Sequence, residues 1–239
     1  MRNERFSEEF KIESKVFDKR TLLTIFKLIQ KGILKTVESV IKEGKESVVV
    51  SAKDKMKGWL ALKIYRVEFT DFKTRWKYLV ADPRFSRTRK NRWFTVITWA
   101  QREFKNMKIA FDAGIKCPEP IFVSKNVLVM GFIGEGGVAA SELIHTKLED
   151  PQQVYEQVED EMKKLAESGL VHTDLSPYNI LMLDVPYLID FSQATTELNP
   201  LAKEFLIRDV KNINKYFSKL GAKVNEDLFE QLKKEMKLD

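Results

Sequence analysis

Short alternating runs of apolar and polar residues fill the first third of the chain, and longer runs with helical spacing fill most of the rest. Strands are predicted at residues 34–42, 48–52 and 59–65, where apolar and polar residues alternate between polar turns. Apolar residues three and four positions apart predict helices between Asp18 and Gly32 and over residues 94–113. The first of these helices is expected to pack on the small sheet that follows it.

The second half of the chain is predicted to be mainly helical. Two short strands come first, at 121–123 and 127–130, and an apolar-to-flexible run at 131–134 suits a hinge. Helices are then predicted at residues 140–144, 152–168, 200–219 and 226–237. The 239 residues are enough for one domain with a large core or for two lobes that share a cleft.

Composition narrows the class of protein. Hydrophobic residues make up 44% and charged residues 32%, as in soluble globular proteins. No apolar run approaches the roughly 20 residues that span a membrane, and the charged N-terminus is unlike a signal peptide, so a cytoplasmic location is expected. The single cysteine, Cys117, excludes an internal disulfide and, with only two histidines, argues against a Cys/His zinc site. A net charge of +6 and a pI near 9.1 leave an acidic partner such as RNA or a nucleotide open.

Four polar residues at fixed spacing interrupt the apolar runs of residues 170–194. His172, Asp174 and Asn179 form the pattern H-x-D-x-x-x-x-N, and Asp190 begins the sequence D-F-S after a short hydrophobic run. In protein kinases this pattern holds a catalytic Asp and two metal ligands. A carboxylate orients a hydroxyl nucleophile and accepts its proton, while amide and carboxylate oxygens suit a hard cation such as magnesium. The pattern therefore indicates phosphoryl transfer if the rest of a nucleotide site lies upstream.

Several upstream residues are suited to such a site, each with a plainer alternative. Lys63 ends the strand LALK, where it either reaches ATP phosphates or lies on a solvated face. Glu103 lies mid-helix among apolar residues and is either exposed or paired, with Lys63 as the natural partner. The turn EGKES has one glycine, Gly44, with Lys45 and Ser47, and is either a phosphate loop or a simple hairpin turn.

Two further segments have open alternatives. Met130 and the backbone of residues 131–133 either line an adenine slot or continue a core strand into a loop. The basic run at 84–92 is a solvated loop, a contact for phosphate backbones, or a carrier of phosphorylation at Ser86 or Thr88.

The order of these blocks resembles the RIO family of atypical protein kinases. LALK, the mid-helix Glu103, LVMGFIG, HTDLSPYN and IDFSQA match that family. VFDKRTLLTIFKLIQKG, GKES, GIKCPEPI and NPLAKEFLIRDVKNIN are similar to its first, RIO-one, subfamily in the minimal archaeal form. The similarity runs from residue 16 to about residue 217, and no block resembles the winged-helix domain of the RIO-two subfamily.

The resemblance implies an α+β, bilobal protein-kinase-like fold, with ATP and magnesium or manganese in the cleft between the lobes. A single kinase domain over residues 1–239 would consist of an arm and helix at 1–32, an N-terminal lobe at 33–131 and a C-terminal lobe at 132–239. The N-terminal lobe would hold the antiparallel sheet, and the C-terminal lobe would be mainly helical.

Carried onto this sequence, the resemblance also implies a role for each candidate residue. Asp174 would be the catalytic acid, Asn179 and Asp190 would hold the metal, and Asp190 would also be transiently phosphorylated. The basic run at 84–92 matches a flexible loop that carries autophosphorylated serine in the family. The implied nucleotide-binding residues are Gly44, Lys45, Ser47, Lys63, Glu103, Met130, Gly131 and Ile133.

Three departures from kinase patterns shape the expected mechanism. Thr173 replaces the Arg of H-R-D that pairs with a phosphorylated activation loop, so switching by that route is not expected. Only a few residues separate IDFSQA from NPLAKEFL, which leaves no room for an activation segment or a platform for a peptide substrate. Gly131 stands where an acid is common in the family.

Three functions remain open on this basis. The first is a serine kinase that phosphorylates itself, or an ATPase in which Asp190 accepts the phosphoryl group before water does, acting with rRNA in maturation of the small ribosomal subunit. The second is a nucleotide-gated factor that docks on a pre-ribosomal particle, for which ATP binding rather than turnover matters. The third is a basic RNA-binding protein that takes no nucleotide.

Overall fold

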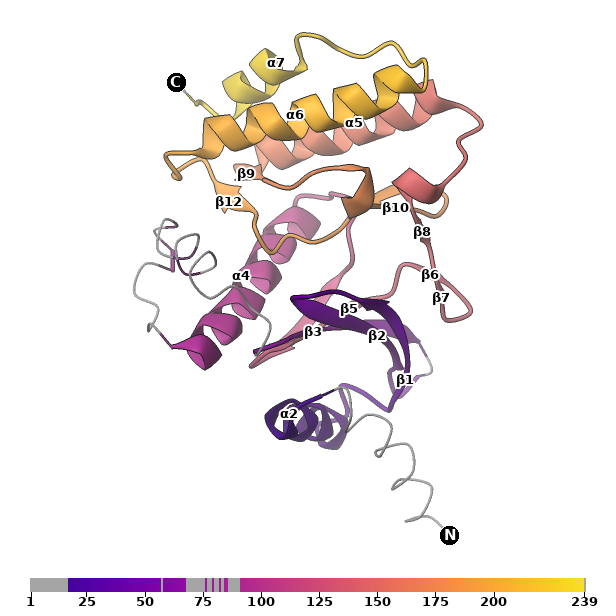
Figure 1. Ribbon diagram of the computed structural model, residues 1–239, viewed down its shortest axis with the longest axis vertical. Helices are drawn as coiled ribbons and strands as arrows, with labels where there is room; N and C mark the ends of the chain where they lie inside the picture. The colour runs from indigo at the N-terminus through magenta and orange to yellow at the C-terminus, as the bar shows by residue number, and fades with distance from the viewer. Residues whose placement is uncertain are drawn as a thin grey trace.

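The structure is a computed structural model that describes residues 17–56, 58–67, 76, 79, 82, 84–85 and 91–238 (Figure 1). A five-stranded antiparallel sheet with the order β1-β2-β3-β5-β4 forms the N-terminal part. Its strands are β1 (Thr36–Glu43), β2 (Ser47–Lys53), β3 (Trp59–Tyr65), β4 (Pro120–Ser124) and β5 (Val127–Gly131). Each predicted strand is present, with boundaries within two residues of those expected.

Helix α2 (Lys19–Gln30) covers one face of this sheet, as the apolar pattern predicts. The side chain of Asp18 caps its first turn by accepting a hydrogen bond from the backbone N–H of Thr21 at 2.9 Å. The helix ends before Gly32, whose φ of +74° is a left-handed conformation that favours glycine. Ile25 and Leu28 pack there against apolar residues of the sheet.

Alternation along β3 distributes its side chains between two environments. Leu60, Leu62 and Ile64 join the apolar cluster under α2, whereas Lys63 and Tyr65 point to the opposite face. That second face is covered by helix α4 (Arg92–Asp112), which Asn91 caps through a 2.9 Å bond from the backbone N–H of Trp93. The strand therefore presents its lysine on the side where α4 lies.

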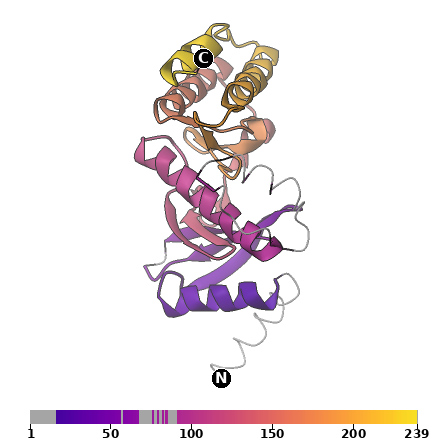
Figure 2. The same cartoon turned by 90° about the vertical axis from the view of Figure 1, so that its left-hand side faces the viewer.

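The C-terminal part packs three helices over small pieces of sheet: α5 (Pro151–Glu167), α6 (Ala202–Lys219) and α7 (Leu228–Glu235). Figure 2 shows α4 running from the level of the sheet towards these helices. Met107 and Ala110 of α4 belong to the large apolar core that α5, α6 and α7 share, so α4 joins both parts. The short strands are β6 (Gly134–Glu135), β7 (Val138–Ala139), β8 (Ser141–Glu142), β9 (Leu170–Val171), β10 (Ile180–Met182), β11 (Pro186–Leu188) and β12 (Thr195–Thr196).

One predicted helix is wrong. Residues 140–144 were expected to be helical, but Ser141 and Glu142 form β8, which pairs with β10, and a single 3₁₀ turn follows at Leu143–His145. A run this short has too few internal hydrogen bonds to form a helix by itself, and pairing with β10 satisfies its backbone instead. Helix α6 begins at Ala202 rather than at residue 200. In the described part of the chain, no helix is long and apolar enough to cross a membrane.

Candidate active site

A cavity of about 460 Å³ lies between the sheet and the C-terminal part. Val49 and Ala61 line it from the sheet side, and Leu181 and Ile189 line it from the other side. Such an apolar slot with polar groups at one end is typical of a site for a planar ring with a charged tail. Of the candidate residues, those that line the cavity are Gly44, Ser47, Lys63, Glu103, Met130, Gly131, Ile133, Asn179 and Asp190.

A lysine between two carboxylates forms the polar end of the cavity. The Nζ atom of Lys63 lies 2.8 Å from Glu103 Oε1 and 2.8 Å from Asp190 Oδ1. The Glu103 side chain is only 1% exposed, whereas that of Asp190 keeps 38% of its surface and opens to the cavity. The alternative of solvated Lys63 and exposed Glu103 is therefore wrong, because strand alternation and the apolar face of α4 bury both.

These charges shift one another's titration. Burial alone would lower the pKa of Lys63, but the carboxylates of Asp190 and Glu103 outweigh it and raise that pKa. Burial raises the pKa of Glu103 even though Lys63 opposes the shift. For Asp190, burial also acts to raise the pKa, but the Lys63 ammonium prevails and holds it well below its usual range. Lys63 and Asp190 are accordingly both charged at neutral pH.

Side chains of helix α6 hold the loop that carries Asp174. The carboxylate of Asp209 accepts hydrogen bonds from the backbone N–H groups of Thr173 at 2.7 Å and of Leu175 at 2.9 Å. Burial raises the pKa of Asp209 to about 7, although these two donors favour its ionised form. Arg208 adds a hydrogen bond to the Thr173 carbonyl. Together these contacts hold Thr173 at a φ of +69°, a left-handed conformation that β-branched residues rarely adopt.

Asp174 itself is exposed and does not line the cavity, but it contacts a residue that does. The side-chain nitrogen of Asn179 donates to the Asp174 carbonyl at 2.8 Å and to its Oδ2 at 3.4 Å. This orientation leaves the amide oxygen of Asn179 for another partner. Partial desolvation, followed by the negative charge of Asp190, raises the pKa of Asp174. A carboxylate with such a shift accepts a proton more readily than an ordinary Asp.

His172 joins the two acidic segments without being part of the chemistry. It is completely buried, and its Nε2 donates to the carbonyl of Ile189 at 3.0 Å. Burial lowers the pKa of His172 to about 4, so the ring is neutral at pH 7. Its ring also packs on Phe191, with centroids 5.0 Å apart. The histidine of the motif thus sets the distance between the Asp174 loop and Asp190.

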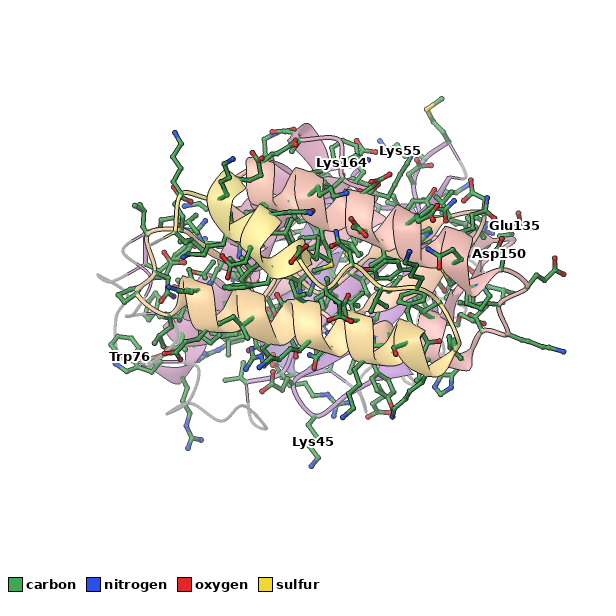
Figure 3. The ribbon with its side chains drawn as sticks, turned by 90° about the horizontal axis from the view of Figure 1, so that it is seen from above. Lys45, Lys55, Trp76, Glu135, Asp150 and Lys164 are labelled. Atoms are coloured by element: carbon green, nitrogen blue, oxygen red, sulfur yellow. The ribbon has the colours of Figure 1, made fainter. Side chains whose placement is uncertain are left out.

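Lys45 lies apart from the other candidates. It is exposed, does not line the cavity, and points away from the body of the protein in Figure 3. The backbone N–H of Gly131 already donates to Glu119 O at 2.8 Å, so this N–H is not available to a ligand. A Cβ at position 131 would lie 3.2 Å from the backbone nitrogen of Glu119, so any side chain there requires a small shift of the Glu119 backbone. Ser86 and Thr88 lie outside the described residues.

Four buried polar residues next to the site were missed by the sequence patterns. The Tyr65 hydroxyl donates to Glu103 Oε2, and the other three bind backbone groups of the acidic segments. Tyr65 lies two positions after Lys63, so alternation along the strand was a usable signal for it. The other three residues are Arg102, Asn106 and Asp209. For them the usable signal was a polar residue on an otherwise apolar helix face.

An antiparallel sheet and a helical part that enclose a Lys–Glu–Asp cluster define the protein-kinase-like fold. Solved structures that share this fold include two of the Rio2 kinase from Chaetomium thermophilum. One is its complex described as ADP/Mg²⁺-phosphoaspartate, with a TM-score of 0.72 and 23% identity over 91% of this chain and 66% of that one. The other has a TM-score of 0.71 and 25% identity over 89% of this chain and 66% of that one, so this chain spans just under two thirds of both.

The chain belongs to the RIO family, because the model of the RIO domain matches residues 48–229. It is 39% identical to the RIO-type serine/threonine-protein kinase Rio1 of Haloferax volcanii over 222 residues, 92% of this chain and 77% of that protein. It is 40% identical to the Rio1 kinase of Methanocaldococcus jannaschii over 231 residues, 95% of this chain and 79% of that protein. These relatives place it among the RIO-type serine/threonine kinases, in the Rio1 subfamily, and confirm the resemblance, the fold class and the enzyme class.

Proposed function

We propose that this kinase transfers the γ-phosphoryl group of ATP either to a serine hydroxyl or to Asp190, with water completing ATP hydrolysis in the second case. The observation that carries the proposal is the position of the Lys63 ammonium, 2.8 Å from both Glu103 and Asp190 at the end of an apolar cavity. An ammonium held there meets phosphate oxygens and stabilises the charge that develops during transfer.

The donor set fits magnesium or manganese. Asn179 offers an amide oxygen and Asp190 an ionised carboxylate, both on the cavity wall. Among the described residues, no cluster of three or more His, Cys, Asp or Glu side chains is able to hold a metal by itself. Two oxygen ligands suit Mg²⁺, which completes its shell with phosphate oxygens and water. When bound, the ion neutralises charge on the phosphates and aligns them.

Within this site we assign distinct tasks to the two acids. Asp174, with its raised pKa and exposed side chain, orients the acceptor hydroxyl and takes its proton. Asp190, with its lowered pKa, stays ionised for the metal and is the alternative acceptor. Met130, Gly131 and Ile133 would hold the adenine, and Gly44 and Ser47 would face the phosphates. The proposed lobes are residues 33–131 and 132–239, which meet at this cavity.

The chemical stability of protein-bound phosphate separates the two acceptors. After incubation with γ-labelled ATP and Mg²⁺, phosphoserine survives acid and hydroxylamine, whereas an aspartyl phosphate is released by hydroxylamine. Asp190 as acceptor predicts hydroxylamine-sensitive label; serine as acceptor predicts resistant label. Asp174→Asn is predicted to suppress the phosphoserine label, because a serine hydroxyl must lose its proton, whereas the ionised carboxylate of Asp190 has no proton for Asp174 to take. No label and no phosphate release from the wild-type protein would refute the proposal.

A partner in the small ribosomal subunit is proposed on grounds of charge. Helix α2 has no acidic residue between its ends and exposes Lys19, Arg20, Lys27 and Lys31. A basic helix face neutralises phosphates of RNA, and such binding weakens steeply with salt. The Lys27→Glu/Lys31→Glu variant should therefore bind small-subunit rRNA fragments at least tenfold more weakly and with a smaller salt slope. Equal binding by the variant and the wild type would contradict this assignment.

The path of the chain after Asp190 favours the second candidate, a nucleotide-gated docking factor. Strand β12 (Thr195–Thr196) pairs with β9 only five residues after Asp190, and α6 follows at Ala202. No activation segment intervenes, so a peptide platform is absent from this described stretch. The test is whether Asp174→Asn, once it no longer releases phosphate from ATP, still binds to and dissociates from a pre-ribosomal particle in an ATP-dependent way. If it does, ATP turnover is dispensable and the second candidate holds.

A further inference from the structure

Helix α4 has a buried arginine directly beside Glu103. The Arg102 side chain is 1% exposed, which is rare for arginine and requires partners for its guanidinium. Its Nη2 donates to the carbonyls of Gln193 at 3.0 Å and Ala194 at 3.2 Å. One turn further along α4, the Asn106 amide donates to the carbonyls of Phe191 at 3.0 Å and Ala194 at 2.6 Å. Both side chains thus hold the backbone that follows Asp190.

That backbone starts from a strained residue. Asp190 has a φ of +63°, a left-handed conformation that costs free energy for any residue other than glycine. It persists only if its surroundings hold it, and the hydrogen bonds from Arg102 and Asn106 to residues 191–194 are such a constraint. Since α4 also carries Glu103, these bonds fix Asp190 relative to the Lys63–Glu103 pair.

The guanidinium is itself oriented by an acid from the segment that precedes α4. Asp82 is completely buried, and its Oδ2 lies 3.6 Å from Arg102 Nε and 2.7 Å from Arg84 Nη2. Leu79 and Phe85, from the same segment, pack with Trp99 of α4 and with Tyr65 in one apolar cluster. Arg84 hydrogen-bonds the Asp82 carboxylate through Nε and Nη2, and Arg102 Nε adds a longer, 3.6 Å ion pair to the same carboxylate. The buried charges of Asp82 and Arg102 therefore lie close enough to stabilise each other.

We infer that Asp82 and Arg102 act as a pair of positioning residues for Asp190. Asp82 orients the Arg102 guanidinium, which donates hydrogen bonds to the carbonyls of Gln193 and Ala194. These bonds keep the Asp190 carboxylate facing the nucleotide cavity. Asp82, which precedes α4 in the chain, thus takes on the ordering role that an activation segment has in ordinary kinases. The inference rests on the metal-binding role proposed above for Asp190.

Two measurements test the pair, one of them independent of nucleotide and metal. The first is amide hydrogen exchange of the nucleotide-free protein at Ser192 and Ala194, and the second is the Mg²⁺ concentration for half-maximal turnover. Asp82→Asn keeps the size of the side chain and removes its charge. It is predicted to speed exchange at these amides about tenfold and to raise the Mg²⁺ half-saturation about tenfold, as loss of an outer partner of a metal ligand commonly does.

The matched control is Tyr155→Phe. Tyr155 is equally buried, but its hydroxyl binds Asn214 at 3.1 Å and the Asn225 backbone at 2.8 Å, within the C-terminal helices. It should lower stability without a local change at residues 192–194. If exchange at those amides rises equally in Asp82→Asn and Tyr155→Phe, the effect is global and the inference is overturned. If exchange rises in neither variant, the effect is absent and the inference is also overturned.

Coupling between the two residues gives a second criterion. Arg102→Lys removes the planar guanidinium that Asp82 is inferred to orient, so adding Asp82→Asn to it should change the Mg²⁺ half-saturation less than twofold further. If the effects of the two substitutions on the Mg²⁺ half-saturation multiply fully in the double variant, the pairing is overturned. If Arg102→Lys does not fold, the result for Asp82→Asn alone decides whether the inference holds. Asp190→Asn separates the two proposals: if it leaves Mg²⁺ dependence unchanged, the metal site fails; if it abolishes that dependence while Asp82→Asn has no effect, only the pairing fails.

Discussion

Replacing Lys63 with methionine leaves Glu103 as a buried carboxylate without its cation. Asp190 is 38% exposed and turns towards water, but Glu103 is 1% exposed and has no such route. Breaking a buried ion pair in this way costs roughly 3–5 kcal/mol. The cost has a ceiling, because Glu103 is able to take up a proton instead of remaining charged.

The upper limit on this cost is the free energy needed to protonate Glu103, and it increases with pH. The ordinary pKa of the carboxyl is 4.5, and burial raises the folded-state pKa of Glu103. A raised folded-state pKa means that stability is greatest below the unfolded pKa and is lost as the pH rises. At pH 7.5, three units above the ordinary value, protonation costs about 4 kcal/mol, and at pH 5.5 it costs about 1.4 kcal/mol. Lys63→Met should therefore lower the melting temperature by roughly 10 °C at pH 7.5 and by less than half of that at pH 5.5.

Thermal unfolding at the two pH values is the assay, and a double variant is its control. Lys63→Met/Glu103→Gln has no ionisable group at position 103, and the Tyr65 hydroxyl still finds an oxygen acceptor there. It should recover most of the stability at pH 7.5 and lose the difference between the two pH values, while remaining inactive. If Lys63→Met is equally destabilised at both pH values, or if the double variant is no more stable than the single one, the reasoning about a buried pair is refuted.

Three other substitutions or reagents test separate parts of the structure. Tyr65→Phe removes the donor to Glu103 Oε2 but keeps the ring, and should lower the unfolding free energy in denaturant by about 1–3 kcal/mol; an unchanged value would show that the bond contributes nothing. The pKa of Asp209 is raised to about 7 in the folded state, so its contribution to stability is lost as the pH rises from 4 through 7. Asp209→Asn should flatten that part of the melting-temperature profile, and a profile parallel to that of the wild type would contradict the assignment. Burial raises the pKa of Cys117 to about 12, so alkylation at pH 8 should proceed only after unfolding; rapid labelling of the native protein would argue against its buried position.

Much of the fold was accessible from the sequence because its periodic patterns are strong. The alternating pattern placed Lys63 on a strand but left open whether it lies on a solvated face, and the capping residue Asp18 and the terminal Gly32 marked both ends of α2. The helix expected at 140–144 failed because its pairing with β10 joins residues about 40 positions apart, which no local pattern encodes.

The candidate site was predicted unevenly for a similar reason. Asn179 and Asp190 were found because their spacing is local, whereas Lys63, Glu103 and Met130 had open alternatives that only the family resemblance narrowed. Nine of the candidates line one cavity. Arg102 and Asp209 were not found, because what makes them important is the distant backbone that they bind. Lys45 belongs to the predicted turn, but its side chain points to solvent rather than into the cavity (Figure 3). A turn sequence does not determine the direction of each side chain.

Phosphate release from ATP by the wild-type protein and by Asp174→Asn tests the central claim most directly. The same samples should be titrated with nucleotide in the presence of Mg²⁺, where a site filled to about 100 times its dissociation constant stabilises the fold by about 2.7 kcal/mol. The account predicts that the wild type turns over only with Mg²⁺ and that Asp174→Asn is slower by a factor of about 10²–10⁴ while it still binds nucleotide. Equal turnover by the two proteins, or a wild-type protein that ATP and Mg²⁺ do not stabilise at all, would contradict the account.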